Sequence, residues 1–160
     1  MQTRFPQLRR VSIRLRHLLG THRLAIHDDA AEREARKPHL LVIDAEESIC
    51  FSMSDYFLLR GYRVDTARQI EEAERLVQST EYQVIIQDLR LGTTRNPDGL
   101  DIIKLARRRL PETRIIVLTA YGSAEIEDEA RRCGADAFLT KPKPLSQIAQ
   151  VVQGLIESRA

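Results

Sequence analysis

The stretch from Tyr82 to Gly99, YQVIIQDLRLGTTRNPDG, decides the fold of this chain. Its apolar run Val84–Ile86 is β-branched and has no helical period, which is typical of a strand buried on both faces. Asp88 stands where this strand pattern stops. The carboxylate at the strand end is therefore the first candidate for a functional residue.

Three other apolar runs also end in polar residues: Leu40–Ile43 at Asp44, Ile115–Leu118 at Thr119, and Ala137–Leu139 at Thr140 and Lys141. In an open parallel sheet, the carboxyl ends of the strands lie along one edge, and ligands of such sheets bind there. A helix cap or a solvated charge would explain any one of these residues, but not the shared pattern. The sequence therefore predicts one site built from four strand ends: Asp44, Asp88, Thr119 and Lys141.

Strand and helix patterns alternate through the body of the chain. Strands are predicted at 40–43, 62–66, 84–86, 114–118 and 136–140. Helices are predicted at 46–60, 70–78, 100–110, 123–132 and 145–157, with Gly61 ending the first and Gly134 following the fourth. Five strand–helix pairs in a row predict an α/β fold, a doubly wound parallel sheet with helices on both faces.

The composition fits one domain with an appendage. The chain has 160 residues and 42% hydrophobic residues, which is enough for a single core. It has neither an apolar run of about 18 residues nor a signal-peptide pattern, so we expect a soluble cytoplasmic protein. Cys50 and Cys133 lack the spacing of metal ligands, and we interpret them as thiols rather than a disulfide framework.

Residues 1–37 differ in charge from the rest of the chain. They carry nine Arg and Lys against four Asp and Glu, whereas the remainder carries 16 basic and 19 acidic residues. Apolar residues between Phe5 and Leu19 have a helical spacing, although Val11–Arg16 also alternates as a strand would. We predict a basic N-terminal extension, partly helical. Its open interpretations are a nucleic-acid contact, a helix for a membrane surface or a partner, and a solvated leader.

Taken in order, the motifs at the strand ends resemble the receiver domain of response regulators from bacterial two-component systems, the CheY-like family. The matching segments are Leu41–Ser48 (LVIDAEES), Asp88–Leu91 (DLRL), Asp98–Leu100 (DGL), Leu118–Gly122 (LTAYG) and Gly134–Pro142 (GADAFLTKP). The resemblance assigns residues 38–160 to the receiver domain. It implies a flavodoxin-like, five-stranded parallel sheet of strand order 2-1-3-4-5.

The resemblance also implies the chemistry of the site. Asp88 would accept a phosphoryl group from a sensor histidine kinase or a phosphotransfer protein. The ligands implied for Mg²⁺ are the carboxylates of Asp44 and Asp88 and the backbone carbonyl of Arg90. Thr119 and Lys141 would bind the phosphoryl group.

A switch and its readout are implied as well. Thr119 and Phe138 would report the modified state, and Pro142 would follow a cis peptide bond. Such a domain is no turnover enzyme. It signals to a downstream protein through the face formed by helix 123–132, strand 136–140 and helix 145–157, and a homodimer is a second form of assembly.

The chain departs from the family at the metal-binding acids. Ala45 follows Asp44 where the family usually has a second acid. Losing even an outer partner of a metal ligand typically costs about 10–100-fold in affinity, so we predict weak Mg²⁺ binding. Glu46 is longer and one residue further on, which makes it an additional candidate ligand. The segment between Asp88 and Gly99 is also longer than the usual loop of the family.

Ala45 supports an alternative, a pseudo-receiver that binds proteins without being phosphorylated. A third class, the aspartate-nucleophile phosphatases of the haloacid dehalogenase type, requires a second Asp two residues after the nucleophile. This chain has Arg90 at that position, which argues against the class.

Overall fold

The computed structural model describes residues 30–91 and 99–158, and the chain divides into two compact units, Met1–Arg36 and Lys37–Ala160. In the first unit, residues 30–36 form an exposed helix in which Arg36 pairs with Glu32 at 3.5 Å. The helix or strand predicted between Phe5 and Leu19 lies outside the described residues. None of the helices described is both long and apolar enough to span a bilayer.

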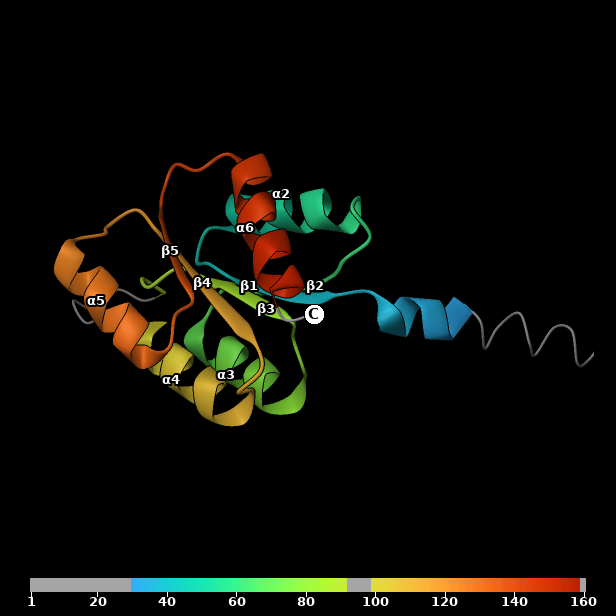
Figure 1. Ribbon diagram of the computed structural model, residues 1–160, viewed down its shortest axis with the longest axis horizontal. Coiled ribbons are helices and arrows are strands. Elements are labelled where there is room, and N and C mark those ends of the chain that lie inside the picture. The colour runs from blue at the N-terminus through green and yellow to red at the C-terminus, as the bar shows by residue number, and fades with distance from the viewer. Residues whose placement is uncertain (1–29, 92–98, 159–160) are drawn as a thin grey trace, which may run out of the picture. The chain divides into compact units, whose positions relative to one another are not determined.

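The second unit is built on a five-stranded parallel sheet (Figure 1). Its strands are β1 (His39–Ile43), β2 (Arg63–Ala67), β3 (Val84–Gln87), β4 (Arg114–Thr119) and β5 (Ala137–Thr140), in the spatial order β2-β1-β3-β4-β5. In register, Leu41 of β1 lies between Asp65 of β2 and Ile85 of β3. The predicted strand order and the flavodoxin-like fold class are therefore confirmed.

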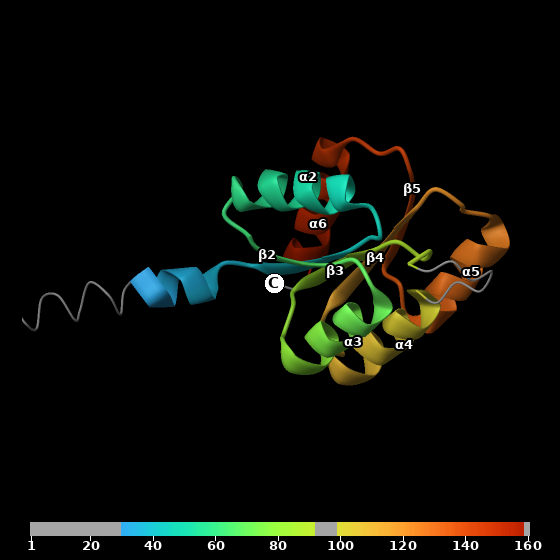
Figure 2. The same ribbon diagram turned by 180° about the vertical axis from the view of Figure 1, so that it is seen from behind.

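Helices cover both faces of this sheet. They are α2 (Glu47–Leu58), α3 (Ile70–Ser79), α4 (Gly99–Arg109), α5 (Ala124–Cys133) and α6 (Leu145–Glu157). Figures 1 and 2 show α2 and α6 on one face and α3, α4 and α5 on the other. Each of these strands and helices begins and ends within two residues of its predicted bounds.

Alternate residues of each strand feed two separate cores. On β1, Leu41 and Ile43 belong to the core under α3, α4 and α5, whereas Leu40 and Val42 belong to the core under α2 and α6. Burial on both faces explains why β1, β3 and β4 have nearly continuous apolar sequences instead of an alternating pattern. The two cores fix the sheet and thereby the positions of its strand ends.

The end of α2 differs slightly from the prediction. The helix stops at Leu58 rather than at residue 60, and a turn continues from there to Gly61. The Gly61 N–H donates to the Leu58 carbonyl at 3.0 Å, and the Tyr62 N–H donates to the Phe57 carbonyl at 3.1 Å. These two bonds are those of a Schellman cap. Gly61 has a φ of 82°, a left-handed conformation that glycine adopts without strain.

Candidate functional site

Three of the four predicted site residues meet at the carboxyl edge of the sheet. The Lys141 ammonium lies 2.6 Å from Asp44 Oδ2 and 2.8 Å from Asp88 Oδ2. Lys141 follows β5, and β4 lies between β5 and β3 in the sheet. A long side chain is therefore needed to carry a positive charge from the end of β5 to the two carboxylates.

Backbone N–H groups hold the other oxygen of each carboxylate. The Glu46 N–H donates to Asp44 Oδ1 at 2.9 Å, and the Arg90 N–H donates to Asp88 Oδ1 at 3.1 Å. In both cases, an aspartate side chain binds the backbone two residues further on. Each carboxylate thus has one oxygen fixed by the backbone and the other by Lys141, so its orientation is set before a ligand binds.

The three charged side chains are largely buried, with exposed fractions of 5% for Asp44, 11% for Asp88 and 12% for Lys141. Burial disfavours the charge on Lys141, but the hydrogen bonds and charges of Asp44 and Asp88 outweigh burial and raise the pKa of Lys141 above its ordinary value. Lys141 is therefore protonated at neutral pH. Two carboxylates and one ammonium leave the cluster with one net negative charge.

Thr119 joins the cluster through the main chain. Its carbonyl accepts the Lys141 N–H at 2.8 Å, and its buried hydroxyl accepts the Tyr121 N–H at 3.4 Å. Phe138 of β5 is partly buried and packs against the core under α3, α4 and α5. The peptide bond between Lys141 and Pro142 is cis. The parts that the resemblance assigns to Thr119 and Phe138 in a switch stay predictions.

The oxygen atoms of the site are of the types that Mg²⁺ binds in proteins. This ion binds one or two carboxylates and completes its shell with waters and phosphate oxygens. Asp44 and Asp88 would supply the carboxylates and Arg90 a backbone carbonyl. Within residues 30–91 and 99–158, no group of three or more His, Cys, Asp or Glu is arranged to hold a metal ion. Glu46 as an additional ligand therefore stays a prediction.

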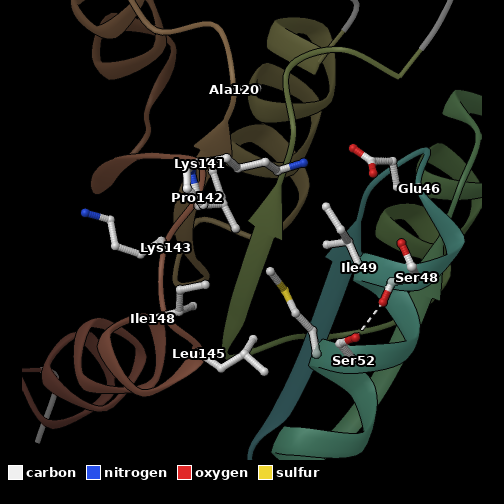
Figure 3. A pocket seen from close by; sticks show the side chains of 12 residues that line it. Glu46, Ser48, Ile49, Ser52, Ala120, Lys141, Pro142, Lys143, Leu145 and Ile148 are labelled. Atoms are coloured by element: carbon white, nitrogen blue, oxygen red, sulfur yellow. Dashed lines mark hydrogen bonds between the residues drawn. The ribbon is translucent and has the colours of Figure 1, made fainter.

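Ala45 and Glu46 border two different cavities. Ala45 lines a polar hollow of about 670 Å³ together with Arg68 and Leu91. Glu46 lines a cavity of about 510 Å³ that also contains Lys141. The walls of this second cavity are mainly apolar side chains of α2 and α6: Ile49, Met53, Leu145 and Ile148. Figure 3 shows the Glu46 carboxylate pointing toward the Lys141 ammonium.

Sequence reasoning missed two contacts that close the base of the loop after Asp88. The Gln87 side-chain amide donates to the Gly99 carbonyl, and the Gly99 N–H donates to the Leu89 carbonyl at 3.2 Å. A Cβ at Gly99 would lie only 2.7 Å from Leu89 Cα, so only glycine fits here without displacing the backbone. We call these two hydrogen bonds the Gln87–Gly99 clamp. The motif Asp98-Gly99 was the available signal, but its partners could not be inferred from it.

A cation–π contact was missed as well. The Arg90 guanidinium lies 3.8 Å from the centre of the Tyr121 ring. Arg90 comes two residues after Asp88 and Tyr121 two residues after Thr119, so this pair joins two of the loops that surround the site. The contact depends on how these loops approach each other, and the sequence holds no signal for that.

Comparison with known proteins gives a consistent result. The profile of the response regulator receiver domain matches residues 40–153. The photosynthetic apparatus regulatory protein RegA of Cereibacter sphaeroides is 29% identical over 119 residues, which cover 74% of this chain and 63% of RegA. The response regulator protein PilR of Pseudomonas aeruginosa is 32% identical over 123 residues, covering 74% of this chain and 26% of PilR. The chain thus spans less than two thirds of the length of these relatives.

Solved structures agree with the sequence relatives. A response regulator from Burkholderia pseudomallei, crystallised with a phosphorylated aspartic acid, a calcium ion and citrate, is 31% identical and has a TM-score of 0.69. The match covers 76% of this chain and 70% of that one. Because the family profile matches well over half of the sequence at the strands and helices described above, the chain belongs to the response regulator receiver domain family of two-component systems.

Proposed function

We propose that this chain is a phosphoryl-accepting receiver and that Asp88 is the acceptor. The donor in this proposal is a sensor histidine kinase or a phosphotransfer protein. The observation that supports it is the position of Asp88, a largely buried carboxylate with one oxygen 2.8 Å from the Lys141 ammonium and Asp44 on the other side of that ammonium. A nucleophile, an ammonium and a second carboxylate in one pocket match the needs of phosphoryl transfer, which depends on positioning and charge neutralisation.

In the proposed reaction, an oxygen of Asp88 attacks the phosphorus atom of a phosphohistidine. The phosphorus–nitrogen bond breaks, its electron pair returns to the histidine, and an acyl phosphate forms on Asp88. Lys141 neutralises charge on the phosphoryl oxygens, and the hydroxyl of Thr119 donates a hydrogen bond to one of them. The Lys141 ammonium already lies 2.8 Å from Asp88 Oδ2. The Lys141 backbone N–H donates to the Thr119 carbonyl, so Thr119 lies next to Lys141.

Charge is the main obstacle to this reaction. Like unit charges about 4 Å apart repel by about 4 kcal/mol at an effective dielectric constant of about 20, and the cluster already carries one net negative charge. Mg²⁺, when bound by Asp44, Asp88 and the Arg90 carbonyl, supplies the missing positive charge. Because Ala45 provides no ligand, we expect weak binding of this ion and slow phosphorylation.

The output of the domain is a change in protein binding. Thr119 and Phe138 are the proposed switch residues, and the proposed surface for the downstream protein is formed by α5, β5 and α6. Binding of a second copy of this chain through the same surface is the alternative to binding a downstream protein. The proposal places the protein in the cytoplasm as a signalling domain without turnover. For residues 1–37 it keeps both alternatives, a contact with nucleic acid or membrane and a solvated leader.

A pseudo-receiver is the second candidate function, and Ala45 favours it. In that case the same fold binds its partner without modification, and Lys141 remains between the two carboxylates. Asp88 would then be a structural partner of Lys141 and not a nucleophile.

Incubation with acetyl phosphate separates the two candidates. We expect the intact mass to rise by one phosphoryl group in a Mg²⁺-dependent manner, and the Asp88→Asn variant to show no rise. Ala45→Asp, which restores the usual acid pair, is the matched variant and should be phosphorylated at a Mg²⁺ concentration about 10–100-fold lower. If the wild type stays unmodified at saturating Mg²⁺ while Ala45→Asp is modified, the pseudo-receiver is the correct function.

A further inference from the structure

The Lys141 ammonium has capacity for one more partner. It carries three hydrogens, and the carboxylates of Asp44 and Asp88 take two of them at 2.6 and 2.8 Å. Among the described residues, a third acid borders the same cavity as Lys141, and this acid is Glu46. Figure 3 shows the two charged groups directed toward each other.

The backbone fixes which way Glu46 can reach. Its N–H is bound to Asp44 Oδ1 at 2.9 Å, and α2 begins at the next residue. The side chain extends into the cavity between α2 and α6, and it does not line the hollow beside Ala45. The Glu46 side chain thus shares a cavity with Lys141 and not with Ala45.

A divalent cation and Lys141 compete for the same place. Both would lie between the two carboxylates, and like charges at such short separation repel each other strongly in a site with little exposure to water. Lys141 must therefore withdraw from at least one carboxylate before the cation is bound tightly. A second acceptor within reach lowers the energy of the withdrawn position, because a buried ammonium without a partner is costly.

We propose that Glu46 is a positioning residue that receives the Lys141 ammonium when a cation enters between Asp44 and Asp88, and that it is not itself a ligand of that cation. This inference rests on the proposed function in one respect, the assignment of Asp44 and Asp88 as the cation ligands. It assigns Glu46 a part in the reaction through Lys141 alone.

A double-mutant cycle read by calorimetric titration with Mg²⁺ tests the proposal. The cycle consists of the wild type, Glu46→Gln, Lys141→Met and the double variant. We expect Glu46→Gln to weaken Mg²⁺ binding about tenfold in the wild type. In the Lys141→Met background, the same substitution should leave the affinity unchanged, because there is no ammonium to receive. Lys141→Met alone should bind Mg²⁺ more tightly than the wild type.

Glu47→Gln is the matched control. It removes one carboxylate from the next residue, whose side chain pairs with Arg68 at 3.3 Å and is 79% exposed. Both substitutions remove the same charge at the start of α2, so an effect of the general electrostatic field would appear in both. We expect Glu47→Gln to change the affinity less than twofold. Lys141→Gln serves as the second background if Lys141→Met unfolds, as judged by circular dichroism.

The four proteins of the cycle can also be made in the Ala45→Asp background, where we expect Mg²⁺ to bind more tightly. Glu46→Gln should again weaken Mg²⁺ binding only when Lys141 is present. An equal loss on Glu46→Gln with and without Lys141 would show that Glu46 is a cation ligand and overturn the proposal. No loss in the wild type would overturn it too. Because the cycle reads binding only, an Asp88 that is never phosphorylated would refute the proposed function and leave this inference standing.

Discussion

Two charged clusters lie at opposite edges of the same sheet, and they differ in the sign of their excess charge. At the amino edge, the Asp136 carboxylate precedes β5 and receives Arg107 at 3.0 Å, Arg114 at 3.3 Å and the Ile115 N–H at 2.7 Å. At the carboxyl edge, two carboxylates share the single ammonium of Lys141. The first cluster has an excess of positive charge around one acid, and the second has an excess of negative charge around one base.

Arg107 forms several further hydrogen bonds at the amino edge. Besides Asp136, its guanidinium donates to the carbonyls of Pro111 at 3.0 Å and Thr113 at 2.9 Å, and to that of Gly134. These bonds join the end of α4 to the start of β4 and to the turn before β5. A cluster with such bonds stabilises the fold, whereas the carboxyl edge keeps unused charge and unused hydrogens for a ligand. The comparison teaches that the excess charge at the carboxyl edge is negative, as a site for a cation requires.

The largest expected effect on stability comes from the amino edge. Asp136→Ala leaves two partly buried guanidiniums without their acid, and we expect the free energy of unfolding to fall by roughly 2–3 kcal/mol. Urea unfolding measures this change. Asp101→Ala removes an exposed acid that pairs with Lys104, and should cost less than about 0.5 kcal/mol. Equal losses of stability in the two variants would show that the Asp136 cluster stabilises the fold no more than an exposed ion pair does.

The amino edge also predicts a pH dependence. His39 is buried at the start of β1, and its Nε2 lies 3.0 Å from Asp65 Oδ2, which accepts the Tyr82 hydroxyl at 2.8 Å. Burial lowers the pKa of His39, and the opposing attraction of Asp65 does not offset it. The unfolded chain therefore binds this proton more readily. The stability that neutral His39 contributes is present above the ordinary value of 6.5 and is lost as the pH falls through the lowered pKa.

Urea unfolding at a series of pH values from about 8 to 5 checks this expectation, which follows from linkage between protonation and folding. The His39→Gln variant, which cannot titrate at this position, should show a flatter profile. A wild-type profile that is equally flat would contradict the expected role of His39.

At the carboxyl edge, a substitution should change binding more than stability. Asp44→Asn removes the excess negative charge and keeps an oxygen for the Glu46 N–H, so we expect the free energy of unfolding to change by less than about 1 kcal/mol in either direction. Calorimetric titration should detect no Mg²⁺ binding in the same variant. A loss of stability as large as that of Asp136→Ala would show that the two edges are built alike.

A small effect on stability is expected in the loops beside the site. Tyr121 is 59% exposed and its ring lies under Arg90, and exposed contacts of this kind contribute about 0.5–1 kcal/mol. Tyr121→Leu should lose about that amount in urea unfolding. Tyr121→Phe retains the ring and should match the wild type. If both variants lose the same amount, the hydroxyl and not the ring is responsible.

The sequence predicted the carboxyl edge better than the amino edge. Asp44, Asp88 and Lys141 each follow a strand of a parallel sheet, so the common direction of the strands brings them to one edge. Asp136 and Arg107 are joined across 29 positions through a helix end and a turn, and no periodic pattern marks such a contact. Even at the carboxyl edge, the direction of Glu46 depends on the extended backbone before α2, with φ −82° and ψ 114°, which composition does not reveal.

The Gln87–Gly99 clamp has a consequence for how this domain can vary. It joins the chain just before Asp88 to the first residue of α4, so the two ends of the segment 92–98 are held together independently of the residues between them. Doubling the number of residues between two fixed chain positions costs only about 0.6 kcal/mol in closure entropy. Insertions there should therefore be tolerated without shifting Asp88, which makes this segment a suitable place to graft a new recognition sequence.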